Sequence, residues 1–243
     1  MRVGDTVHRR SGYWTRSVDA LLAHLQRVGF DAAPRPLGID DEGRSILSFV
    51  PGEAHLGWPD PMPVWVYEDE ETLSSAAQLL RRYHDAVATF IPPPDARWRV
   101  VAPGRHEVIC HNDWGPYNAL FEGHRPVVML DWDSAGPGPR IWDLAWSAYT
   151  SVPLNTKGLG PNGMPIATRA ARLATFSETY GGVEPASVLA MLVEALPFLA
   201  NTIQAEAEAG DPGSVKLANW DAPARARADA AIIREQSELL LRR

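Results

Sequence analysis

The chain has 243 residues, enough for one domain or for two lobes that share a cleft. Hydrophobic residues make up 45% and charged residues 22%, a balance typical of a globular protein and not of a disordered one. The net charge of -7 disfavours a nucleic-acid partner, because such binders are usually basic, and it suits a cationic small molecule as well as simple solubility. The single cysteine, Cys110, excludes an internal disulfide and a cysteine-based zinc site.

The start of the chain has no apolar segment typical of a signal peptide. No apolar run approaches the roughly 18–20 residues that a membrane-spanning helix needs. The sequence therefore predicts a cytoplasmic protein without a membrane partner.

The N-terminal part is predicted to be mixed α/β. Ser17 is suited to cap a helix, and Gly29 is suited to end it. The turn residues 41–43 separate two strand-like runs, and Pro51-Gly52 breaks the sheet. The predicted elements are a strand at 5–10, a helix at 17–28, and strands at 34–40 and 45–50.

The rest of the chain is predicted to be mostly helical. Residues 53–68 contain several prolines and are expected to be a connection, and a helix is predicted from Glu71 to Phe90. Two strand-like runs follow at 119–122 and 126–130, joined by a turn. Helices are predicted from Arg140 onward, with breaks near 153–166, 181–185, 210–213 and 221–223 and a kink at Pro197.

The most informative segment runs from His111 to Asn118 and is followed, after the predicted hairpin, by Asp131. An Asp, an Asn five residues later and a second Asp after a hairpin are the groups that phosphoryl transfer from ATP needs. The first Asp accepts the proton of the attacking hydroxyl, and the Asn and second Asp hold Mg²⁺ against the phosphates. The hairpin should bring these groups together, because its two ends lie side by side.

These residues resemble the aminoglycoside phosphotransferase family, a branch of the kinase-like fold that includes small-molecule kinases. That family carries His-x-Asp-x-x-x-x-Asn, then a hairpin, then an Asp that closes a hydrophobic strand. The resemblance is dense over 105–150 and looser over 17–90. Three elements in the correct order are more specific than a lone Asp and Asn. The matching segments are 108–113, 127–131 and 138–145.

The resemblance implies an α+β, protein-kinase-like two-lobe fold. Residues 1–50 would form a reduced N-lobe sheet on the nucleotide side, and 51–243 a mostly helical C-lobe with the catalytic loop and the substrate side. By the same resemblance Asp113 is the catalytic base, and Asn118 and Asp131 are Mg²⁺ ligands. His111 would brace the loop, Asp143 would cap or tether the helix that it opens, and Asp133 would face either the same cleft or water.

Residues 45–52 resemble the strand that leads into the family's inter-lobe hinge. The base of ATP, or of another nucleoside triphosphate, would bond there to backbone groups near Ser48, Phe49 and Val50. An ordinary buried strand with a turn is an equally good interpretation of this stretch.

The pattern departs from the family at the N-terminus. No glycine-rich hairpin precedes the first strand, and Arg9 stands where the family has a phosphate-contacting Lys. The partner Glu of that Lys would fall at Val18, with Asp19 beside it. The chain is therefore a shortened form with an upstream start, a kinase that relies on its C-lobe and Mg²⁺, or a relative that binds without transferring phosphate. We expect ATP to bind in the high micromolar range or more weakly, and an exposed N-lobe sheet edge that favours a homodimer.

The sequence thus predicts ATP-dependent phosphorylation of a hydroxyl on a small polar molecule, such as an aminoglycoside-like antibiotic or related natural product. The alternative is a non-catalytic, pseudokinase-like module that binds a small molecule or a protein.

Overall fold

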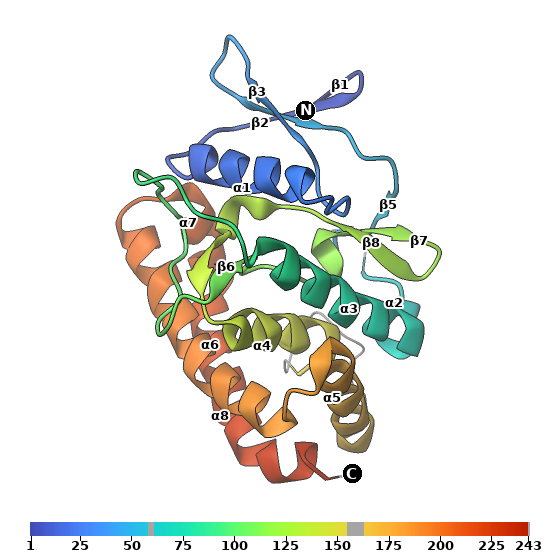
Figure 1. Ribbon diagram of the computed structural model, residues 1–243. Helices are drawn as coiled ribbons and strands as arrows, with labels where there is room; N and C mark the ends of the chain where they lie inside the picture. The colour runs from blue at the N-terminus through green and yellow to red at the C-terminus, as the bar shows by residue number, and fades with distance from the viewer. Residues whose placement is uncertain (58–60, 155–162, 243) are drawn as a thin grey trace.

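The computed structural model describes residues 1–57, 61–154 and 163–242. An N-terminal antiparallel sheet has the strand order β1-β2-β4-β3. Helix α1 lies against this sheet, between it and the centre of the molecule (Figure 1). The elements are β1 (Arg2–Val3), β2 (Thr6–Arg9), α1 (Thr15–Arg27), β3 (Pro36–Ile39) and β4 (Ser45–Ser48).

Helix α1 forms because its apolar residues recur at helical spacing, and the side chains of Val18, Leu21 and Leu25 are buried. The predicted cap is wrong, because the helix begins at Thr15. Ser17 lies inside it, and its hydroxyl accepts a hydrogen bond from the backbone N–H of Arg97 at 2.7 Å. This bond ties α1 to a segment far along the chain.

The N-terminal sheet has two edge strands, β1 and β3. Leu37 and Ile39 of β3 are each 52% exposed, so the predicted exposed edge is present. A row of unpaired backbone groups can pair with another chain. Dimerisation through this edge stays a prediction.

The centre of the molecule combines helix α3 with two small sheets (Figure 1). Asp69 caps α3 by accepting a hydrogen bond from the N–H of Glu71 at 2.9 Å. The stretch expected to be a simple connection contains a strand and a short helix, so that prediction is wrong for those residues. The elements are β5 (Glu53–Ala54), α2 (Trp65–Glu68), α3 (Glu70–Val87), β6 (Val108–Cys110), β7 (Ala119–Glu122), β8 (Arg125–Met129) and β9 (Gly136–Gly138). One sheet has the order β5-β7-β8, and the other pairs β6 with β9.

Helices make up most of the described chain after β9. They are α4 (Arg140–Ser151), α5 (Ile166–Gly181), α6 (Pro185–Glu208), α7 (Pro212–Asn219) and α8 (Ala222–Leu240). Helices α4 and α5 lie on the side away from the N-terminal sheet, and α7 lies near one end of α1 (Figure 1). The predicted break at 153–166 lies partly outside the described residues. Pro197 lies within α6, which continues through it.

Helix α6 is long and apolar enough to cross a membrane by length and composition, which the sequence analysis did not anticipate. A core helix of a soluble protein passes the same test. Leu192 and Leu196 are buried, and the helix packs against α4, α7 and α8. Its apolar character is thus explained in part by the helices around it.

The N-terminal sheet and α1 are fixed to the centre by contacts distant in sequence. The N–H of Met129 donates to the carbonyl of Ala32 at 2.9 Å. One hydrophobic core extends from Leu22 and Leu47 to Leu144 and Leu192. The lobe boundary after Val50 stays a prediction.

Candidate functional site

The site is built around the loop that follows β6 and around the β7–β8 hairpin. The N–H of Leu130 donates to the carbonyl of Asn118 at 2.8 Å, so the two ends of the hairpin lie side by side as predicted. Asn112 and Asp131 both have left-handed backbone conformations, with φ of 63° and 56°. Non-glycine residues in this region are uncommon and are found where surrounding structure holds them in place.

Asp143 holds the loop in this conformation. The carboxylate is fully buried and accepts hydrogen bonds from the N–H groups of His111 at 2.7 Å and Asn112 at 2.9 Å. The ring Nε2 of His84 lies 3.0 Å from the same carboxylate. Burial alone would raise the pKa of Asp143, but the hydrogen bonds and charges around it lower that pKa below its ordinary value. Asp143 therefore tethers the loop after β6 to α4 and does not cap the helix.

The role of His84 was missed in the sequence analysis. It lies on the buried face of α3, and its Nδ1 is 2.6 Å from the hydroxyl of Tyr180. Because Nε2 faces a carboxylate, it carries the proton, and Nδ1 accepts from Tyr180. A histidine among apolar residues at helical spacing was the one available signal in the sequence.

His111 connects the loop to the end of the hairpin. Its Nε2 lies 3.0 Å from the carbonyl oxygen of Leu130, and its Nδ1 accepts from the N–H of Asp113 at 3.3 Å. Burial lowers the pKa of His111, so the ring is neutral at neutral pH. These contacts match the bracing role that the family resemblance implies.

Asp113 is oriented by two neighbours from its own loop. The hydroxyl of Tyr117 donates to Oδ1 at 2.8 Å, and Nδ2 of Asn118 donates to Oδ2 at 2.9 Å. Burial raises the pKa of Asp113 to about 7, against the lowering effect of the hydrogen bond from Tyr117. A carboxylate with a pKa near neutral is suited to accept a proton in catalysis. Tyr117 was missed, although it lies four residues after Asp113.

Arg9 lies against the predicted metal ligand Asp131, a contact that the sequence did not indicate. Its Nη2 is 2.7 Å from Oδ1 of Asp131 and 3.0 Å from Oδ2 of Asp133. Burial would lower the pKa of Arg9, but the charges of the two aspartates raise it above its ordinary value. Asp133 thus faces the same place as Asp131. Asp19 also belongs to this acidic environment, since burial and the charge of Asp133 raise its pKa to about 6.

The predicted hinge residues are brought near the start of the chain. The N–H of Ser48 donates to the carbonyl of Arg35, and the N–H of Phe49 donates to the carbonyl of Asp5. The guanidinium of Arg2 stacks over the ring of Phe49 at 3.5 Å. Both N–H groups are therefore engaged within the protein, and the role of Ser48, Phe49 and Val50 at a nucleotide base stays a prediction. Val50 follows the sheet, and its N–H has no partner among the described residues.

Asn118 and Asp131 provide an oxygen donor set suited to Mg²⁺. Oδ1 of Asn118 accepts no hydrogen bond from a described residue, and the Asp131 side chain is half exposed. Within the described parts of the chain, no group of three His, Cys, Asp or Glu residues could hold a metal ion. Mg²⁺ commonly uses one or two carboxylates together with water and phosphate oxygens, so a sparse donor set fits it.

Comparison with known proteins places this loop and hairpin in a family. Residues 95–187, which contain every catalytic and metal residue predicted from the sequence, match the model of the Phosphotransferase enzyme family. The match is to this segment, which holds the loop and the hairpin, and not to the whole chain.

Two solved structures support the kinase-like fold. Amicoumacin kinase hAmiN, in complex with AMP-PNP, Ca²⁺ and Ami, has a TM-score of 0.58 at 11% identity, over 93% of this chain and 80% of that chain. The GDP complex of aminoglycoside 2'-phosphotransferase-IIIa has a TM-score of 0.57 at 11% identity, over 94% and 87% of the two chains. The predicted α+β, two-lobe kinase-like fold is confirmed.

A curated protein is similar in sequence over part of its length. The Trifolitoxin immunity protein of Rhizobium leguminosarum bv. trifolii is 38% identical over 160 residues, which are 63% of this chain. The match spans 58% of the length of that relative.

Proposed function

We propose that this phosphotransferase-family protein transfers the γ-phosphate of ATP to a hydroxyl of a small polar molecule. The observation that supports this best is the environment of Asp113. Tyr117 and Asn118 hold its two carboxylate oxygens, and burial raises its pKa to about 7. A carboxylate held in this way can orient a hydroxyl and accept its proton as the oxygen attacks phosphorus.

In this proposal Asn118 and Asp131 hold Mg²⁺. The ion, when bound, neutralises charge on the phosphates of the nucleotide. Asn118 also donates to Asp113, so one side chain would link the metal ligands to the base. Arg9 lies against Asp131 and is suited to donate charge-assisted hydrogen bonds to phosphate oxygens.

We place the nucleotide base at the end of β4, where the N–H of Val50 is available. Ser48 and Phe49 would then contribute side chains or carbonyl groups but not N–H groups, because these already have partners. ATP or another nucleoside triphosphate could occupy this position. The structural neighbours hold an adenine nucleotide analogue, AMP-PNP, in one case and GDP in the other.

An antibiotic or related natural product is the substrate class that we favour. The structural neighbours act on amicoumacin and aminoglycosides by name, and the curated relative is named for immunity to trifolitoxin. The acidic net charge of this chain suits a substrate that carries amines.

The function can be tested by incubating the protein with Mg²⁺-ATP and a panel of hydroxylated amines, followed by mass detection of products. The proposal predicts that one or more compounds gain a single phosphate and that an equal amount of ADP appears. A protein that binds these compounds and Mg²⁺-ATP but forms no phosphorylated product would instead be the non-catalytic alternative.

A further inference from the structure

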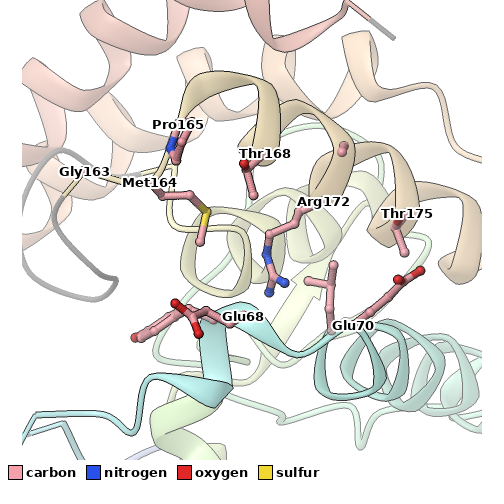
Figure 2. A pocket seen from close by; sticks show the side chains of 11 residues that line it. Glu68, Glu70, Gly163, Met164, Pro165, Thr168, Arg172 and Thr175 are labelled. Carbon is pink, nitrogen blue, oxygen red and sulfur yellow. The ribbon is translucent and has the colours of Figure 1, made fainter.

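A cavity of about 580 Å³ lies between α5 and the facing segment of α2 and α3 (Figure 2). Tyr67 and Leu73 contribute to one wall, and Thr168 and Thr175 contribute to the other. The volume falls within the range of pockets that bind small molecules. None of the described lining residues belongs to the proposed phosphotransfer site.

Arg172 is a buried cation in this cavity. Figure 2 shows its side chain pointing from α5 toward α2. Arg172 is only 7% exposed, and its Nη2 donates to the carbonyl of Ser151 at 3.3 Å. Its Nε is buried without a hydrogen-bond partner, and no described carboxylate forms an ion pair with it. A buried charge without such a partner is costly unless a ligand supplies one.

Acidic side chains line the opposite wall. Glu68 and Glu70 are exposed residues of the α2–α3 segment, and in Figure 2 they lie on either side of Arg172. Neither forms an ion pair with Arg172, although the charge of Asp69, followed by those of Glu70 and Glu68, acts on it. The cavity therefore presents a buried cation between two accessible anions.

We propose that this cavity binds a small zwitterion with a carboxylate and an ammonium group, as α-amino acids and dipeptides have. The carboxylate pairs with the guanidinium of Arg172, whose planar fork matches carboxylate geometry. The ammonium group lies toward Glu68 or Glu70, and the hydroxyls of Thr168 and Thr175 provide neutral hydrogen-bonding groups. This second site needs neither nucleotide nor Mg²⁺.

The test is calorimetric titration of the full chain, without nucleotide, with alanine, alanyl-alanine, N-acetyl-alanyl-alanine and alanyl-alanine amide. We expect saturable binding of alanine or of alanyl-alanine. Whichever of the two binds more tightly shows whether the ligand is a free amino acid or a peptide. Blocking either end of the dipeptide should weaken binding about tenfold or more, since a hydrogen bond to a charged group is lost. Arg172→Gln should weaken binding of the best probe to the same extent.

Arg169→Gln is the matched control. Arg169 lies on α5 as well, but it contacts Gln236 and does not line the cavity, so its substitution should leave binding unchanged. If Arg172→Gln fails to fold by circular dichroism, the double variant Glu68→Gln and Glu70→Gln replaces it, because both residues are exposed. That variant should bind the zwitterion and its N-acetylated form with equal affinity.

Three results would overturn the proposal. They are the absence of saturable binding to the wild-type protein at millimolar concentration, equal binding of the free and amidated dipeptides, and unchanged binding by the folded Arg172→Gln variant. Loss of phosphotransferase activity alone would not affect it, because no step of this test uses ATP.

Discussion

Replacing Asp143 by alanine should destabilise the protein strongly. The change removes a fully buried carboxylate that accepts from the N–H groups of His111 and Asn112 and lies 3.0 Å from Nε2 of His84. Each buried donor left without a partner costs about 1–3 kcal/mol, and the change leaves the two N–H groups and the Nε2–H of His84 without their acceptor. We therefore expect the free energy of unfolding to fall by about 3–5 kcal/mol.

Urea unfolding, followed by tryptophan fluorescence and by circular dichroism, measures this change. Asp85→Ala is the control, because Asp85 is exposed and forms surface ion pairs with Arg81 and Arg140. Its loss should change the free energy of unfolding by less than about 1 kcal/mol. A value for Asp143→Ala within about 1 kcal/mol of wild type would refute the conclusion that this carboxylate holds the loop.

The destabilisation caused by Asp143→Ala should also depend on pH. The folded protein lowers the pKa of Asp143, so its stabilisation is present above the unfolded value of about 4. It is lost as the pH falls through the folded pKa. The difference in free energy of unfolding between wild type and Asp143→Ala should therefore become smaller at acidic pH.

The remaining predictions concern the proposed site. Asp131→Ala should remove any dependence of nucleotide binding on Mg²⁺, and calorimetry showing equal ATP affinity of the wild type with and without Mg²⁺ would count against this metal site. Tyr117→Phe removes a hydrogen bond that lowers the pKa of Asp113, so the pKa of Asp113 should rise. The midpoint of the pH–rate profile should then move to higher pH, and an unchanged or lower midpoint would contradict this. ATP should bind in the high micromolar range or more weakly, because the turn between β1 and β2 has two residues and offers few N–H groups to phosphates; submicromolar binding would contradict it.

Local patterns predicted much of the fold. The strand at 119–122 has the predicted bounds, and the ends of the hairpin meet as the spacing indicated. The ends of the longer helices were predicted within a few residues. Their apolar side chains recur every three or four residues, which places them on one face of a helix. The short elements β1, β5, α2, β6 and β9 were not among the predicted elements, because two to four residues carry too little periodicity to recognise.

The contacts that complete the site could not be read from local patterns. Arg9 and Asp131 are 122 residues apart, and His84 and Asp143 are 59 apart, so only the fold brings each pair together. The motif located Asp113 but not its partner Tyr117, because a tyrosine at that spacing is equally suited to packing. The contact between the N–H of Phe49 and the carbonyl of Asp5, 44 residues away, likewise depends on the fold.

The central claim, that Asp113 accepts the proton of the attacking hydroxyl, is tested most directly by Asp113→Asn. The amide keeps the shape of the side chain but cannot serve as the base. With a substrate identified from the panel, kcat of the variant should fall by about 10²–10⁴-fold, while its circular dichroism spectrum stays unchanged. Turnover by the folded variant at a rate close to wild type would contradict the account.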